Sequence, residues 1–237
     1  MTDPPIRAAC FDFQDTLATF RDGNGYRLYI EAAAERGVTV TSEQLEMDTA
    51  SAWAAYQTPL GPDHSAHSGD EASFLAVRAA VHARRLTAAG VEQALAIEIG
   101  RRIDALEADA ARYRLYDDTV PALERLAAAG VRAVILSNHI WRLPEVAAAL
   151  GLDRLVAGVV TSARVGYRKP HPAMFAAALA VAGTARGETL MVGDSIRDDV
   201  DGALRAGMRA TLLDRAGRHA GFTRTPVIRS LSEIALA

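Results

Sequence analysis

The chain has 237 residues, of which 50% are hydrophobic and 23% are charged, and its formal net charge at pH 7 is −3. This composition is typical of a soluble globular protein and excludes an intrinsically disordered chain. The mild acidity disfavours a nucleic-acid partner, which requires a basic surface. The one cysteine, Cys10, rules out a disulfide framework, and no apolar run reaches the ~18 residues of a membrane span. We therefore expect a cytoplasmic protein without a nucleic-acid or membrane partner.

The N-terminal half combines one expected strand with a long helical block. An apolar run over residues 6–13 predicts a buried parallel strand. Between residues 25 and 113 helical patterns dominate, and no strand signal is found. Helices are predicted there over 26–36, 42–56, 70–88 and 91–110. The loop between the second and third helices contains His64 and His67, but it lacks the further ligands that a metal site would need. We expect this block to be an all-helical insertion after the first strand.

From residue 117 onward, predicted strands and helices alternate. Strands are predicted over 131–137, 155–161, 189–194 and 209–214. Helices are predicted over 117–130, 141–151, 171–183 and 198–207. This alternation predicts a doubly wound α/β protein, in which helices cover both faces of a parallel sheet.

In a doubly wound sheet the ligand site lies beyond the carboxyl ends of the strands. The polar side chains predicted at those ends are Asp12, Gln14, Asp15, Thr16, Ser137, Asn138, Lys169, Asp194, Ser195, Asp198 and Asp199. Carboxylates are the oxygen ligands that Mg²⁺ prefers, and a lysine and a serine can bind a phosphoryl group. A carboxylate can also attack phosphorus when nearby cations neutralise the charge that develops. The residues thus predict metal-assisted transfer from a phosphorylated substrate.

Four segments resemble the four motifs of the haloacid dehalogenase-like (HAD) superfamily, in the right order and at the predicted strand ends. They are FDFQDTL at 11–17, ILSN at 135–138, GYRKPHPAMF at 166–175 and VGDSIRDDVDGALRAGM at 192–208. The resemblance implies a Rossmann-like core over 1–17 and 114–237, with a helical cap of the C1 type over 18–113. It also implies Mg²⁺-dependent hydrolysis of a small phosphorylated metabolite by a monomer or homodimer.

The resemblance assigns the catalytic and phosphate-binding roles residue by residue. Asp12 matches the nucleophile that becomes an aspartyl-phosphate. Lys169 matches the lysine that balances the charges of nucleophile and phosphate. Ser137 matches the phosphate-binding serine or threonine, and Thr16 and Asn138 are assigned to the phosphate with it.

The same resemblance predicts a Mg²⁺ site. Asp12 and the backbone carbonyl of Gln14 match metal ligands of the first motif, and Asp194 matches the metal-binding acid of the fourth. Of the next two acids, Asp199 fits the usual spacing slightly better than Asp198, which stays open as an alternative.

One position departs from the pattern. Phosphatases of this superfamily usually have a second aspartate two residues after the nucleophile, acting as general acid and base, where this chain has Gln14 followed by Asp15 in place of the usual glycine. Glutamine is not a useful proton donor to a leaving alkoxide, and Asp15 either stabilises a turn or partly replaces the missing acid. Two alternatives therefore stay open, a metal-free dehalogenase-type hydrolase and an inactive binder of phosphorylated ligands.

Overall fold

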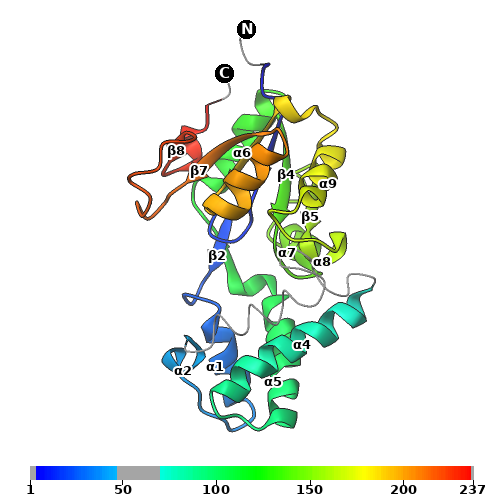
Figure 1. The fold of residues 1–237 in the computed structure, drawn as a ribbon, viewed down its shortest axis with the longest axis vertical. Helices are drawn as coiled ribbons and strands as arrows, with labels where there is room; N and C mark the ends of the chain where they lie inside the picture. Colours follow the sequence, from blue (N-terminus) through cyan, green and yellow to red (C-terminus); the bar gives the residue numbers. More distant parts are fainter. Residues whose placement is uncertain (1–3, 47–69, 236–237) are drawn as a thin grey trace.

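The computed structural model describes residues 4–46 and 70–235 and consists of two lobes (Figure 1). The upper one, called the core lobe, contains a six-stranded sheet with helices on both faces. The lower one, called the helical lobe, is built from residues between the first strand of that sheet and residue 112. None of the helices in the described part of the chain is long and apolar enough to cross a membrane.

The sheet of the core lobe is parallel, with strand order β5-β4-β1-β6-β7-β8. Its strands are β1 (Ala8–Phe11), β4 (Arg132–Ser137), β5 (Gly158–Thr161), β6 (Thr189–Gly193), β7 (Arg209–Leu213) and β8 (Val227–Ile228). The central strand β1 is fully buried because β4 and β6 flank it, with Cys10 opposite Val134 and Met191. The predicted doubly wound α/β class is confirmed.

Alternate residues of β1 supply two separate apolar cores. Phe11 faces the cluster that contains Leu123 of α6, whereas Cys10 faces the cluster that contains Phe175 of α9. The helices of this lobe are α6 (Thr119–Ala128), α7 (Leu143–Ala149), α8 (Ser162–Val165), α9 (Pro172–Ala182) and α10 (Gly202–Arg205). Cys10 is thus a packing residue of the second core.

Two predicted elements differ locally from the structure. The strand expected over 155–161 begins only at Gly158, because the amides of Leu155 and Val156 bond back to the carbonyl of Leu152 in a turn. The helix expected over 198–207 begins earlier, with a wider π-helical turn over Ile196–Asp201 that continues into α10. Such turns often occur at functional sites.

The helical lobe contains α1 (Tyr26–Ala34), α2 (Ser42–Glu46), α4 (Glu71–Ala88) and α5 (Gln93–Glu107), packed around its own apolar core. The Asp70 side chain accepts a hydrogen bond from the Ser73 amide at 2.8 Å and so caps the start of α4. The predicted helix over 42–56 is described only as far as Glu46; the rest of it, and the loop with His64 and His67, lie outside the described residues.

A short antiparallel ribbon joins the two lobes. It pairs β2 (Ala18–Phe20) with β3 (Tyr113–Leu115), and the facing rings of Phe20 and Tyr113 stack with centroids 4.8 Å apart. Neither strand was predicted, because three residues are too few to show a pattern. The predicted boundaries after residues 17 and 113 fall at this ribbon. A second contact between the lobes is the ion pair of Glu71 with Arg142.

Candidate active site

The candidate nucleophile Asp12 follows directly after the buried strand β1. Its backbone amide still donates to the carbonyl of Val192 at 3.0 Å, so the strand pairing holds it at the carboxyl edge of the sheet. Its Oδ1 atom accepts a hydrogen bond from the Phe13 amide at 2.8 Å and lies 3.0 Å from the ammonium of Lys169. The carboxylate is therefore oriented by the main chain and paired with a cation.

Lys169 is almost completely buried, with 2% of its surface exposed. Its ammonium donates to Asp199 Oδ1 at 2.6 Å and to the Leu136 carbonyl at 2.8 Å, in addition to its contact with Asp12. Burial alone would lower the pKa of Lys169, but the two carboxylates outweigh it and raise this pKa. The buried ammonium thus stays charged, which is the state that balancing a phosphoryl group requires.

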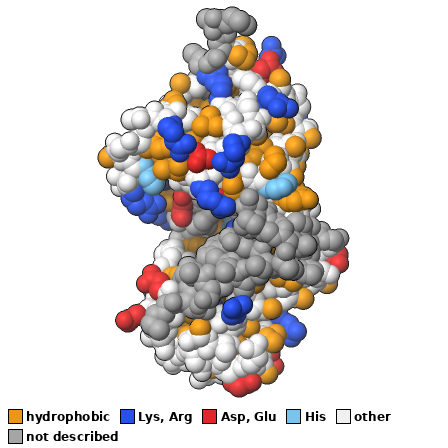
Figure 2. All heavy atoms as spheres, viewed as in Figure 1, with side chains coloured by type: hydrophobic (Ala, Val, Ile, Leu, Met, Phe, Trp, Pro, Cys, Tyr) orange, Lys and Arg blue, Asp and Glu red, His pale blue; other side chains and the backbone are white. Residues whose placement is uncertain are grey.

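Lys169 is also the only lysine in the chain, since every other Lys or Arg position is arginine. The basic side chains spread over the visible face of the core lobe in Figure 2 are accordingly arginines. An ammonium is a compact point charge with rotatable donors, whereas a guanidinium is a wide planar fork. The narrow space between Asp12 and Asp199 suits the former.

Three carboxylates gather beside this lysine. The carboxylate oxygens of Asp12, Asp194 and Asp199 lie within 4.8 Å of one another. Burial, followed by the charges of Asp12 and Asp199, raises the pKa of Asp194 to about 7. Burial likewise raises the pKa of Asp199 to about 6, against the effect of Lys169.

The π-helical turn decides which of the two adjacent acids joins the cluster. Asp199 is fully buried, and its Oδ2 atom accepts from the Ser195 amide at 3.0 Å. A Cβ atom on Gly193 would lie only 2.2 Å from that same oxygen, so glycine is required there. Asp198 instead points toward Arg197, 3.0 Å away. The structure therefore places Asp199, not Asp198, beside Asp12.

The donor set fits a hard divalent cation. Three clustered carboxylates oppose one ammonium, so two negative charges remain uncompensated when all are ionised, and a divalent ion would balance them. After burial, the like charges of Asp12 and Asp199 also raise the pKa of Asp194. In addition, the Thr16 hydroxyl is buried and has no hydrogen-bond partner among the described residues. A ligand with oxygen atoms would satisfy both the excess charge and this hydroxyl.

Ser137 is the last residue of β4 and Asn138 follows it, and β4 pairs with β1, the strand that precedes Asp12. Ser137 is 2% exposed and lies opposite Thr161 in the β4–β5 pair. The Asn138 side chain donates to the Lys169 carbonyl at 3.0 Å and accepts from the Lys169 amide at 2.6 Å. Its two polar atoms thus hold the backbone of Lys169, a function that the sequence-based assignment to phosphate did not foresee.

Gln14 and Asp15 begin the turn that leads to β2. Gln14 Nε2 donates to Asp15 Oδ1 at 3.2 Å, and the same oxygen accepts from the Thr19 hydroxyl at 3.0 Å. Asp15 has φ +58°, and in the described part of the chain it is the only non-glycine residue with a positive φ. Asp15 thus adopts a left-handed conformation that glycine takes without strain.

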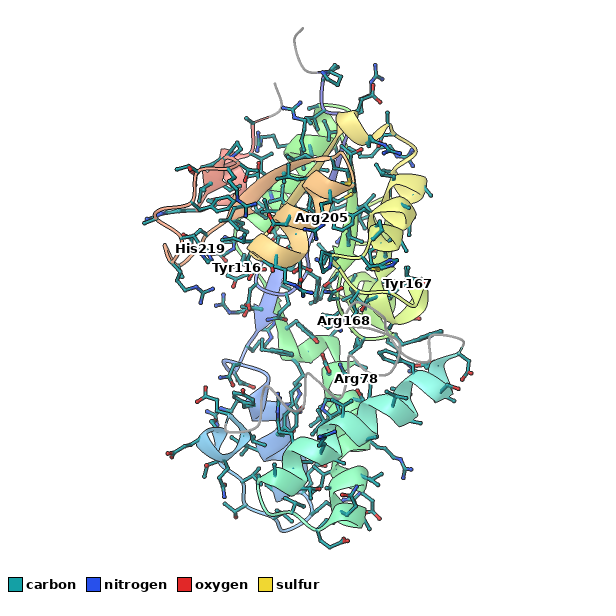
Figure 3. All side chains as sticks on the ribbon, in the orientation of Figure 1. Arg78, Tyr116, Tyr167, Arg168, Arg205 and His219 are labelled. Atoms are coloured by element: carbon teal, nitrogen blue, oxygen red, sulfur yellow. The ribbon has the colours of Figure 1, made fainter. Side chains whose placement is uncertain are left out.

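The structure adds groups that sequence reasoning missed. A cavity of about 220 Å³ beside Asp15 and Asp194 is also lined by Tyr116, Arg215 and His219. Figure 3 shows Tyr116 and His219 together at the edge of the core lobe that faces the helical lobe. Arg215 covers the Tyr116 ring at 3.9 Å and donates to the carbonyl of Thr16 at 2.8 Å. In the sequence, only the position of Arg215 shortly after the strand β7 could have indicated that it lies at the site.

His139, which follows Asn138 in the chain, packs against Phe13, the residue after the candidate nucleophile. Its ring meets Phe13 edge to face, with centroids 5.4 Å apart, and it is 8% exposed. Burial lowers the pKa of His139. The imidazole is therefore a neutral packing group at pH 7.

Comparisons with known proteins find phosphatases and a dehalogenase. A phosphoserine phosphatase from Thermus thermophilus is 32% identical over 188 residues, which cover 78% of this chain and 72% of that protein. A HAD phosphatase from Thermococcus onnurineus superposes with a TM-score of 0.64 at 22% identity, covering 96% of this chain and 95% of that one. A 2-haloacid dehalogenase from Pseudomonas syringae pv. Tomato superposes with a TM-score of 0.65 at 24% identity and the same coverage. The two structural matches therefore show the fold and do not separate the two chemistries.

The family assignment rests on a family model that matches most of the chain. The family model of the haloacid dehalogenase-like hydrolases matches residues 6–207, a range that includes the first three motifs, the helical lobe and all but the last residue of the fourth motif. This range confirms the resemblance inferred from the motifs. The protein belongs to the haloacid dehalogenase-like hydrolase family.

Proposed function

We propose that this hydrolase is a Mg²⁺-dependent phosphatase that acts on a small phosphorylated metabolite through an aspartyl-phosphate on Asp12. The observation that carries the proposal is the cluster of Asp12, Asp194 and Asp199 within 4.8 Å, next to the buried ammonium of Lys169. Its relative from Thermus thermophilus, named a phosphoserine phosphatase, supports a phosphate monoester as the substrate class.

In the proposed first step, a carboxylate oxygen of Asp12 attacks phosphorus and the bond from phosphorus to the substrate oxygen breaks. Lys169 offsets the repulsion between the carboxylate and the phosphoryl oxygens. Ser137 and Thr16 would donate hydrogen bonds to those oxygens. Asn138 would act indirectly, because its amide holds the backbone of Lys169 at the site.

Asp12, Asp194 and the backbone carbonyl of Gln14 would hold the Mg²⁺ ion, with Asp199 close by. When bound, the ion would neutralise negative charge on the transferring phosphoryl group. Asp199 keeps both of its oxygens engaged, one with Lys169 and one with the Ser195 amide. We therefore assign Asp199 to orient Lys169 and to add charge near the ion.

The same cluster argues against a metal-free dehalogenase. A haloacid is itself an anion, and uncompensated carboxylates beside the nucleophile would repel it. Phosphatase chemistry uses the excess negative charge, since it recruits the cation. We also propose that the helical lobe, residues 18–113, is the cap that excludes water from the site while the phosphoryl group is transferred.

The experiment is a screen of phosphorylated metabolites, with and without Mg²⁺, that measures inorganic phosphate. We expect phosphate release that depends on Mg²⁺ and that disappears in Asp12→Asn, whose amide has a similar shape but cannot attack phosphorus. A parallel screen of haloacids measures halide. Halide release without added metal would overturn the proposal. If the protein binds phosphorylated ligands but releases neither product, the binding-protein alternative holds.

A further inference from the structure

The side-chain amide of Gln14 is held in one orientation. Its nitrogen lies 3.2 Å from Oδ1 of Asp15. An ionised carboxylate oxygen accepts hydrogen bonds and donates none, so the amide nitrogen has to face Asp15 and the amide oxygen has to point elsewhere. The assignment of the two ends of the amide thus follows from the chemistry of its partner.

The opposite end of this amide is an acceptor without a donor. Gln14 Oε1 is buried, and no described residue donates a hydrogen bond to it. Buried polar atoms without a partner are uncommon in folded proteins, so each one calls for an explanation. Gln14 lies two residues after the candidate nucleophile and at the same sheet edge, where a ligand or a water molecule can supply the missing donor.

Asp15 keeps its carboxylate at a position that is unfavourable for any residue with a Cβ atom. Its φ of +58° is in the left-handed region, which glycine adopts without strain. The Thr19 hydroxyl donates to the same Oδ1 atom at 3.0 Å, and this contact restrains the carboxylate. The carboxylate is thus held in place while it accepts the hydrogen bond from the Gln14 amide.

We propose that Gln14 orients the water molecule that hydrolyses the aspartyl-phosphate, and that Asp15 is the positioning residue that turns the Gln14 amide oxygen toward this water. The inference rests on the proposed phosphatase function. In the first step the leaving alkoxide needs a proton, and an amide oxygen has none to offer. In the second step the attacking water carries two O–H groups and can donate one of them to Oε1. The available atom of Gln14 therefore matches the second step.

The second step balances without an added base. The water oxygen forms a bond to phosphorus while the bond from phosphorus to the Asp12 oxygen breaks, and Asp12 leaves as a carboxylate. One proton of the water passes to a phosphoryl oxygen, so the product is dihydrogen phosphate. Gln14 accepts a hydrogen bond throughout and takes no proton, as the glutamines of GTPases do when they orient attacking water.

The test separates formation of the phosphoenzyme from its decay. The full chain is phosphorylated with radiolabelled acetyl phosphate and Mg²⁺, the labelled donor is diluted with unlabelled donor, and acid-quenched samples give the decay rate. Gln14→Met keeps the backbone carbonyl and the side-chain length. We expect its phosphoenzyme to form at the parent's rate and to decay roughly ten- to a hundredfold more slowly, the effect of losing one orienting hydrogen bond.

Asp15 is tested by a variant that relieves its backbone strain. Asp15→Gly suits the positive φ and removes the side chain with its carboxylate, so it should fold like the parent while the Gln14 amide becomes free to rotate. We expect decay to slow by about tenfold with formation unchanged. Because Asp15 acts through Gln14, the double variant should decay no more slowly than Gln14→Met alone. Thr19→Val removes the hydroxyl that restrains the Asp15 carboxylate but leaves the contact between Gln14 and Asp15 in place, so it should slow decay less than Asp15→Gly does.

Each other outcome has a defined meaning. Parent-like decay in Gln14→Met overturns the inference, and so does a defect in formation alone, which would place Gln14 at the leaving group. Additive effects in the double variant overturn the positioning role of Asp15. Absence of any phosphoenzyme in the parent is a separate result, because it refutes the proposed function itself.

Discussion

The Lys169 ammonium lies 3.0 Å from Oδ1 of Asp12, in a site where almost no solvent reaches the lysine. Removing this cation leaves Asp12 next to Asp199 without compensation and restores the repulsion between nucleophile and phosphate. We expect Lys169→Met to lower kcat by about 10³-fold, comparable to the loss of one strong electrostatic contact in other active sites. Steady-state kinetics with an aryl phosphate measures the effect.

A second variant separates activity from stability. Lys169→Met should also lower the melting temperature, because it leaves a buried carboxylate unpaired. The double variant with Asp199→Asn removes both buried charges, so it should regain most of the melting temperature but none of the activity. If activity returns as well, Lys169 has only a structural role.

The metal site predicts that substitutions of Asp194 and Asp198 affect the Mg²⁺ dependence differently. Asp194→Asn removes a charged ligand, so its activity should need at least about tenfold more Mg²⁺. Asp198→Asn is the matched control, since Asp198 points toward Arg197 and should leave the Mg²⁺ dependence within about twofold of the parent. Titration of activity with Mg²⁺ compares the two. Equal titration curves for Asp194→Asn and the parent would show that the metal lies elsewhere.

The raised pKa values predict an unusual pH dependence of stability without metal. The pKa of Asp194 is about 7 in the folded protein, whereas its ordinary value is 3.8. Between these two pH values the carboxyl group is protonated in the folded protein and ionised in the unfolded chain. The stabilisation that comes from this proton is therefore fully present below the ordinary carboxyl pKa. It decreases as the pH rises and is lost above about pH 7. Asp199, with a pKa of about 6, contributes in the same direction.

Thermal unfolding between about pH 5 and about pH 8, with and without Mg²⁺, measures this effect. We expect Mg²⁺ to raise the melting temperature more at the higher pH, where the carboxylates are ionised. Asp194→Asn should flatten the pH dependence in the absence of metal. A melting temperature that rises over this pH range in the parent would contradict the charge balance described for the site.

Gln14 predicts a preference among substrates. General-acid help accelerates expulsion of a poor leaving group by roughly 10²–10⁴-fold, and an alkoxide is a poor leaving group whereas a nitrophenolate is not. Aryl and acyl phosphates should therefore be hydrolysed faster than alkyl phosphates. Gln14→Asp should raise turnover of alkyl phosphates much more than that of aryl phosphates and introduce a new acidic group into the pH profile. Fast alkyl turnover by the parent, unchanged in the variant, would mean that another group such as Asp15 supplies the proton.

Much of the fold was predictable because its signals are local. Short apolar runs alternating with helical patterns from residue 117 onward indicate a parallel sheet, and the carboxyl ends of parallel strands meet at one edge. That rule alone predicted that Asp12, Ser137 and Asp194 lie at the same edge of the sheet. The ribbon of β2 and β3 was missed, because each strand is three residues long and is stabilised by a partner more than ninety residues away.

Local patterns were enough to predict the fold class, the edge of the sheet where the site lies, and the chemical types of the groups there. Which of these groups interact depends on how the chain packs. Asp199 rather than Asp198 reaches Lys169 because a π-helical turn and the absence of a Cβ on Gly193 admit its side chain. The orientation of the Gln14 amide and the pKa of Asp194 were likewise undetermined. Charge, burial and hydrogen bonding depend on distances between residues far apart in the chain, and a local pattern does not carry those distances.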